Sequence, residues 1–326
     1  MLEHGGNLRE AARHYGRGDW VDLSTGINPH GYPAPAPSGA AWHRLPEPDP
    51  ALLAAARAYY RARLLLPVAG TQAAIQALPR LRPPSRVAVS APSYAEHAYH
   101  WGLHGHTRRQ VAYAKLQAAI DDSDVVVVVN PNNPTGETIA PERLLDWAAR
   151  LHARGGWLVV DEAFGDTAVD LSVARHAAQP GLIVLRSIGK FFGLAGLRLG
   201  FVAAHERMLA DLADLLGPWA VSGPAQEIAL QALGDTDWQL ATHARLAQAG
   251  KRMARLLQAH GVASAGTPLF RWWPEARPEA FHEHMAARGI WCRLFRDAAR
   301  GIRVGLPASE DEWRRLEQAL QEWSKK

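Results

Sequence analysis

Residues 125–129 are five consecutive valines, and this run constrains the fold more than any other feature of the sequence. A strand made only of apolar residues has no side for solvent, so it fits a sheet that is covered on both faces. Further short aliphatic runs, separated by segments with helical periodicity, continue the pattern. The expected strands are 87–90, 125–130, 157–161, 182–187 and 199–203, and the expected helices are 52–64, 73–81, 92–104, 141–154 and 206–216. This order predicts an α/β domain whose mostly parallel sheet is covered by helices.

The pattern changes after Gly217-Pro218, where helices with a few short strands predict a small α+β domain. Its expected helices are 237–259, 278–288 and 310–323, and its expected strands are 269–273, 290–294 and 302–305. The proline-rich stretch 29–50 predicts a mostly extended arm, because proline fixes φ and removes a backbone donor. We therefore expect an N-terminal arm (1–44) that packs on the functional site, a large α/β domain (45–217) and a small α+β domain (218–326).

Composition argues against several classes of protein. Cys292 is the only cysteine, which excludes a disulfide framework and a cysteine-rich zinc or iron–sulfur site. The 36 basic and 32 acidic residues give a formal charge of +4, and their interspersed placement argues against a nucleic-acid-binding protein. No aliphatic run approaches the roughly 20 residues of a membrane span, and the first six residues do not resemble a secretory signal. We expect a cytoplasmic protein without a metal site and without nucleic-acid or membrane partners.

The segment 187–201 carries the strongest local signal for chemistry. Lys190 follows a predicted buried strand, is flanked by glycine and phenylalanines, and precedes a glycine-rich turn that contains Arg198. An amine in such surroundings can act as a Schiff-base nucleophile. The alternative for a single lysine is a side chain that extends along apolar surface and keeps its ammonium group in water.

Three other segments supply what a pyridoxal phosphate site needs. Asp161 ends a predicted parallel strand, where it would face a ligand crevice and could keep a pyridine nitrogen protonated; alone, it could equally cap the following turn. The turn 129–136, Val-Asn-Pro-Asn-Asn-Pro-Thr-Gly, presents an asparagine amide that could donate to a phenolic oxygen. Residues 70–72 begin a predicted helix, whose free backbone N–H groups favour a phosphate.

Together, and in the order in which they occur along the chain, from residues 70–72 to Lys190 and Arg198, these segments resemble the fold-type I pyridoxal-phosphate enzymes of the class I/II aminotransferase family over essentially the whole chain. The resemblance implies that the large domain binds pyridoxal 5'-phosphate, with Lys190 and Asp161 as catalytic residues. Lys190 would form the covalent link and Asp161 would pair with the ring nitrogen. Tyr94 would stack on the ring and Asn133 would hold its hydroxyl. The residues that it assigns to the cofactor phosphate are Gly70, Thr71, Gln72, Ser187 and Arg198.

The N-terminal region resembles one branch of that family more closely. Residues 4–12 (HGGNLREAA), 22–31 (DLSTGINPHG) and 45–49 (LPEPD) are similar to the L-threonine-O-3-phosphate decarboxylases of cobalamin biosynthesis. The resemblance implies decarboxylation of L-threonine O-3-phosphate to (R)-1-amino-2-propanol O-2-phosphate by a homodimer. An aminotransferase acting on histidinol phosphate or a similar compound stays open, because that branch shares the fold and the core motifs.

The implied substrate carries a carboxylate and a phosphate. Arg303 would pair with the α-carboxylate, and the candidate substrate-binding set is His4, Gly5, Arg293 and Arg303. Which of them meets the phosphate stays open. Phe164, Leu45 and Gly189 depart from the family pattern, and each removes one expected hydrogen bond, worth about 1 kcal/mol.

Overall fold

The computed structural model describes residues 4–297 and 299–324, so residues 1–3 of the N-terminal segment considered above lie outside the described residues. The chain divides into two compact units. Unit 1 comprises Met1–His30, Pro134–Glu137 and Leu240–Lys326, and unit 2 comprises Gly31–Asn133 and Thr138–Gln239. The domain boundaries expected at 44/45 and 217/218 remain a prediction. No helix in the described part of the chain is long and apolar enough to cross a membrane.

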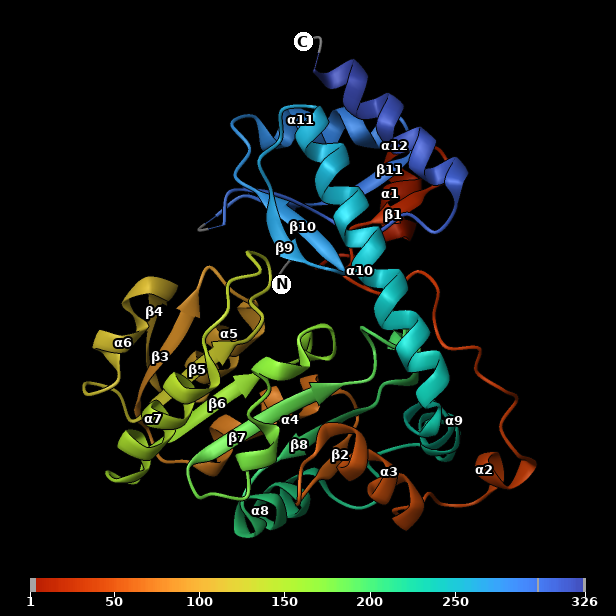
Figure 1. Ribbon diagram of the computed structural model, residues 1–326. Helices are drawn as coiled ribbons and strands as arrows, with labels where there is room; N and C mark the ends of the chain where they lie inside the picture. The colour runs from red at the N-terminus through yellow and green to blue at the C-terminus, as the bar shows by residue number, and fades with distance from the viewer. Residues whose placement is uncertain (1–3, 298, 325–326) are drawn as a thin grey trace. The chain divides into compact units, whose positions relative to one another are not determined.

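Unit 2 is built on a seven-stranded sheet with the order β2-β8-β7-β6-β5-β3-β4 (Figure 1). The strands are β2 (Leu66–Val68), β3 (Arg86–Ala91), β4 (Thr107–Ala112), β5 (Val125–Val129), β6 (Trp157–Asp161), β7 (Leu182–Ser187) and β8 (Gly200–Ala203). Pairing is parallel from β7 through β6, β5 and β3 to β4, whereas β8 is antiparallel to both β7 and β2. The predicted α/β class with a mostly parallel sheet is confirmed.

Both faces of the central strand β5 are buried, as the valine run predicts. Val125 and Val127 belong to one core cluster with residues of the helices α4 (Thr71–Ala77), α5 (Ala95–Leu103) and α8 (Glu206–Leu216). Successive side chains of a strand point to opposite faces, and Val126 and Val128 are also fully buried. Helix α7 (Pro141–His152) packs on β6. The all-apolar strand is therefore the centre of a three-layer unit.

The remaining helical segments of unit 2 are short or lie beside the sheet. Ser38 caps α2 within the proline-rich stretch that predicts a mostly extended arm, and Asp49 caps the helix that follows. The segments are α2 (Gly39–His43), α3 (Pro50–Tyr60), α6 (Leu116–Ala119) and α9 (Gly223–Gly234), with 3-10 turns at Leu78–Leu81, Tyr113–Lys115, Gly165–Thr167, Val169–Leu171, Ala174–His176 and Ala195–Leu197.

Unit 1 contains a five-stranded sheet with the order β1-β11-β12-β10-β9. Its strands are β1 (Val21–Leu23), β9 (Ala265–Thr267), β10 (Phe270–Trp273), β11 (Ile290–Phe295) and β12 (Gly301–Val304), and its helices are α1 (Leu8–Tyr15), α11 (Pro278–Ala286) and α12 (Glu310–Trp323). The long helix α10 (Thr236–Ala259) begins in unit 2 and continues in unit 1. Helix α11 packs on β11 and α12 packs on α11. Because β1 pairs with β11, part of the predicted N-terminal arm belongs to this sheet.

Candidate active site

Lys190 lies in the loop that follows β7, in apolar surroundings. Its Nζ atom is 5.6 Å from the centre of the Phe164 ring. The next two residues, Phe191 and Phe192, are fully buried, and Phe192 stacks on Trp238 with ring centres 5.6 Å apart. This aromatic packing holds the loop in place, so the ammonium group of Lys190 lies over the Phe164 ring.

Asp161 ends β6 and is 3% exposed. Its Oδ2 atom lies 2.9 Å from His97 Nε2, and its Oδ1 atom accepts a hydrogen bond from the Ala163 backbone. His97 is on α5, and sequence reasoning missed it. The available signal was its position three residues after Tyr94 on a predicted helix, since residues at that spacing lie on one helix face. The histidine fixes the orientation of the carboxylate that is expected to meet a ring nitrogen.

Tyr94 precedes α5, and a chain of polar side chains holds it. Its hydroxyl donates to Gln72 Oε1 at 3.2 Å, and Gln72 Nε2 donates to Glu96 Oε2 at 2.7 Å. The same Glu96 oxygen lies 3.0 Å from His100 Nε2. Burial raises the pKa of Tyr94 to about 12, so the phenol stays protonated. The side chain of Gln72 thus orients Tyr94, the residue expected to stack on the ring. The backbone N–H of Gln72 stays available for the predicted phosphate contact.

The start of α4 and Arg198 lie together. Gly70 has φ +73°, and a Cβ atom there would lie 2.5 Å from Arg198 Nη2, so only glycine allows this approach. Ser187 lies opposite Gly200 across β7 and β8, two residues from Arg198. The first backbone N–H groups of a helix have no partner within the helix. The Arg198 guanidinium therefore lies beside the start of α4, and Ser187 ends the neighbouring strand; a cation next to free backbone N–H groups suits a phosphate.

The turn that contains Asn133 is fixed by its neighbours. Asn132 Nδ2 donates to the Pro92 carbonyl at 2.8 Å, which ties the turn to the segment before Tyr94. Asn130 accepts from the Ile139 backbone at 2.8 Å and donates to its carbonyl at 3.2 Å. Asn133 is half-buried within this turn. Its assignment to the ring hydroxyl still depends on its place in the motif.

A buried ion cluster that sequence reasoning also missed joins the ends of β6 and β7. Arg186 lies 2.6 Å from both Glu162 Oε2 and Asp166 Oδ1, and its guanidinium stacks over the Tyr60 ring. Burial alone would lower the pKa of Arg186, but the two carboxylates outweigh it and raise that pKa above its usual range. Because Glu162 follows Asp161 and Arg186 precedes Ser187, the cluster fixes both predicted site residues through the backbone.

Unit 1 holds the predicted substrate-binding residues. Arg293 and Arg303 lie directly opposite each other on β11 and β12, and both guanidinium groups lie over the Phe295 ring, at 5.1 and 5.9 Å. Burial, together with the charge of Arg293, lowers the pKa of Arg303 to about 10, against the effect of Asp22. Gly5 packs against Ser24, which directly follows β1. His4 is exposed. Two cations on adjacent strands suit an anionic ligand.

The residues of unit 2 fit pyridoxal phosphate. Ser90 Oγ and Ser93 Oγ, at the end of β3 and just before Tyr94, are buried and have no hydrogen-bond partner within the described residues. Buried hydroxyls without partners are costly unless a ligand or water satisfies them. The start of α4 with Arg198, the oriented carboxylate of Asp161 and the amine of Lys190 would supply the three contacts that such a cofactor needs.

Comparison with known proteins gives consistent matches. The family model described as "Aminotransferase class I and II" matches residues 19–313. A threonine-phosphate decarboxylase of Pseudomonas aeruginosa is 51% identical over 323 residues, covering 98% of this chain and 97% of that protein. One from Sinorhizobium sp is 48% identical over 330 residues, with the same coverage. The solved histidinol-phosphate aminotransferase of Sinorhizobium meliloti, in complex with pyridoxal-5'-phosphate, has a TM-score of 0.84 at 23% identity, covering 100% of this chain and 96% of that one.

Proposed function

Because this chain belongs to the class I and II aminotransferase family, we propose that it is a pyridoxal-phosphate-dependent carboxy-lyase that decarboxylates L-threonine O-3-phosphate. The product would be (R)-1-amino-2-propanol O-2-phosphate, for cobalamin biosynthesis. The observation that carries the proposal is the close similarity, over nearly the full chain, to two threonine-phosphate decarboxylases.

The residues of unit 2 have separate tasks toward the cofactor. When bound, pyridoxal phosphate supplies a sink for the electrons released as a bond to the substrate α-carbon breaks. Asp161, oriented by His97, holds a proton on the ring nitrogen. Lys190 binds the cofactor and afterwards moves a proton at the substrate α-carbon. Tyr94 covers the ring face and Asn133 donates to the ring hydroxyl.

The phosphate of the cofactor is assigned to the start of α4 and the strand ends beside it. Arg198 contributes charge, and Gly70 allows its approach. The full set proposed for the phosphate is Gly70, Thr71, Gln72, Ser187 and Arg198, with Gln72 acting through its backbone because its side chain is bonded to Tyr94 and Glu96.

The substrate anions are assigned to unit 1. Arg303 pairs with the α-carboxylate, and its lowered pKa means that an anionic ligand would stabilise its charged form. Arg293 lies opposite it on the neighbouring strand. His4 and the Gly5 backbone N–H complete the set that holds a doubly anionic substrate.

The test is release of CO₂ from threonine phosphate by purified protein supplied with pyridoxal phosphate and no keto-acid acceptor. We expect release by the wild type, and none by Lys190→Ala, which should also lose the visible absorbance band of the covalently bound cofactor. Absence of CO₂ from a wild type that shows this band would refute the decarboxylase assignment while leaving cofactor binding intact.

A histidinol-phosphate aminotransferase is the second candidate, favoured by the shared fold with the Sinorhizobium meliloti enzyme. The same residues would serve it, because both reactions break a bond at the substrate α-carbon and would use the same cofactor. It predicts that histidinol phosphate changes the cofactor absorbance without release of gas. That result, together with no CO₂ from threonine phosphate, would establish this alternative.

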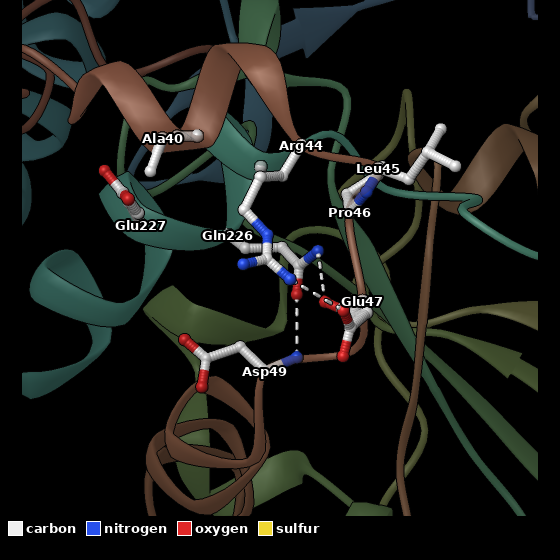
Figure 2. A pocket seen from close by; sticks show the side chains of 10 residues that line it. Ala40, Arg44, Leu45, Pro46, Glu47, Asp49, Gln226 and Glu227 are labelled. Carbon is white, nitrogen blue, oxygen red and sulfur yellow. Dashed lines mark hydrogen bonds and ion pairs between the residues drawn. The ribbon is translucent and has the colours of Figure 1, made fainter.

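We also propose that the protein is a cytoplasmic homodimer. Trp42 and Leu45 are 65% and 63% exposed. Leu45 lines a surface pocket of about 300 Å³, where Gln226 bonds to the backbone of Glu47 and Asp49 (Figure 2), and Trp42 belongs to α2, which precedes it. Exposed apolar side chains beside a rigid pocket are typical of association surfaces. Sedimentation should give a dimer for the wild type and a monomer for Leu45→Glu with Trp42→Glu; a wild-type monomer would contradict the proposal.

A further inference from the structure

Ser24 lies in the segment 22–31, whose resemblance to the family assigns it no role, and it is the centre of a hydrogen-bond cluster. It follows β1 and is 1% exposed. Its hydroxyl donates to Asp22 Oδ1 at 2.6 Å, and its backbone N–H donates to the same oxygen at 2.9 Å. The hydroxyl oxygen also accepts from the Gly6 N–H at 2.7 Å. The backbone carbonyl accepts from Arg303 Nη2 at 2.6 Å. All of these groups belong to unit 1.

The cluster connects two parts of the chain that are far apart in sequence. Through its carbonyl, Ser24 contacts the arginine assigned to the carboxylate. Through its hydroxyl, it contacts Gly6, which follows the predicted anion-binding residues His4 and Gly5. Gly5 also packs directly on Ser24, since a Cβ atom at Gly5 would lie 2.3 Å from the Ser24 carbonyl oxygen. A hydrogen bond at Gly6 and close backbone packing at Gly5 therefore both hold the N-terminal segment against Ser24.

We propose that His4 and Gly5 meet the substrate phosphate and that Ser24 is a positioning residue that places them at a fixed separation from Arg303, and so selects substrates with two anionic groups. The inference rests on the proposed function, because it assigns these residues to the substrate. The hydroxyl and the carbonyl act on different parts of the cluster. Loss of the hydroxyl therefore releases the N-terminal segment but keeps the backbone contact to Arg303.

Ser24→Ala separates these two effects. We expect the KM for threonine phosphate to rise about 3- to 10-fold with kcat nearly unchanged, because one hydrogen bond is worth up to about a factor of ten. Calorimetry on the holoenzyme should show a similar loss of affinity for phosphoethanolamine, which has a phosphate and no carboxylate. Affinity for threonine, which has only the carboxylate, should stay the same.

Ser264→Ala is the matched control, since that serine lies in the same unit and its hydroxyl also accepts one hydrogen bond, from Arg271 at 3.2 Å. It should change none of the three ligand measurements. Equal losses for all three ligands in Ser24→Ala would mean that Ser24 only stabilises the unit, and no loss for any of them would refute its role; either result overturns the proposal.

Gly5→Ala provides a second, independent variant. Its methyl group must displace the segment from Ser24, so phosphoethanolamine affinity should fall at least tenfold, and adding Ser24→Ala should cost little more. Fully additive losses would overturn the coupling. Because phosphoethanolamine and threonine binding are measured without turnover, failure of the wild type to release CO₂ would refute the proposed function without deciding the role of Ser24.

Discussion

Arg186 in unit 2 and Arg303 in unit 1 are both buried arginines at strand positions, yet their pKa shifts have opposite signs. Burial acts to lower the pKa of each guanidinium. At Arg186, Glu162 and Asp166 reverse the effect and raise the pKa. At Arg303, the positive charge of Arg293 adds to it and the pKa falls to about 10. The two units therefore use the same side chain in electrostatically different ways.

The difference separates scaffold from binding surface. A buried cation between two carboxylates of its own chain is complete in the folded protein, so it serves the geometry of the strand ends. A buried cation beside a like charge is stabilised when an anion binds. We infer that Arg186 supports the cofactor residues and that Arg303 is reserved for the substrate.

The largest expected effect is on stability and comes from Arg186→Met. Removing the cation leaves Glu162 and Asp166 buried beside each other, which should lower the free energy of unfolding by about 3–5 kcal/mol. Arg252→Met is the control, because the Arg252–Glu310 pair is 42% and 70% exposed and should contribute at most about 1 kcal/mol. Denaturant unfolding of the two variants measures both. Equal losses would mean that Arg186 contributes no more to stability than the exposed Arg252, which would contradict its role in the scaffold.

Arg303→Gln should produce the reverse pattern. Stability should change little or rise, because a buried charge is removed from beside Arg293. Affinity for threonine phosphate should fall by about 2–4 kcal/mol, the cost of truncating one partner of a buried charge pair. Thermal unfolding and the KM provide the two readings. A large loss of stability with an unchanged KM would place Arg303 in the scaffold with Arg186.

His97→Phe tests whether the carboxylate of Asp161 depends on its partner within unit 2 for binding the cofactor. Loss of the hydrogen bond to Asp161 should weaken pyridoxal phosphate binding by about 1.5–3 kcal/mol, the usual value for a bond to a charged group. His106→Phe is the control, since His106 is also buried but bonds to the Pro79 carbonyl and the Ser85 backbone. It should lower stability and leave the cofactor affinity intact. Spectroscopic titration with the cofactor distinguishes them.

The fold was most predictable where burial is uniform. Strands β6 and β7 and helices α8 and α12 have the expected bounds, because apolar runs or amphipathic stretches end at polar or glycine residues. Strand β4 was missed, since it is an edge strand with the sequence Thr-Arg-Arg-Gln-Val-Ala and mostly exposed side chains. Helix 52–64 was predicted too long; α3 ends at Tyr60, and Arg61 adopts a left-handed conformation.

The candidate site divides in the same way. Lys190 and Asp161 could be predicted as candidate catalytic residues from the sequence, because local motifs surround them. Their roles remain proposals. His97, Arg186 and Ser24 could not, because their partners are distant in sequence: 64 residues separate His97 from Asp161, and 279 separate Ser24 from Arg303. Such contacts are produced by strand order and helix packing. The helical spacing of His97 from Tyr94 is a local signal, but it does not indicate that Asp161 is the partner.

The smallest expected effect is a pH dependence that distinguishes the two arginines. If Arg303 holds the substrate carboxylate as proposed, it does so in its protonated form and binding raises its pKa, so affinity should be flat below a pH of about 10 and fall above it. The fall should approach tenfold per pH unit, equivalent to about 1.4 kcal/mol. In the unfolded chain the pKa of this arginine is higher, so between the folded and the unfolded pKa the unfolded state binds more protons, and the cost of burying the charge falls as the pH rises. Amino groups of the substrate and of the protein also titrate in this pH range, but they do so equally in the wild type and in Arg303→Gln. The ratio of wild-type to variant affinity, measured from about pH 8 to pH 11, therefore isolates Arg303. A ratio that stays constant through pH 10 would mean that the pKa of Arg303 is not lowered. The electrostatic difference between Arg303 and Arg186 would then be absent.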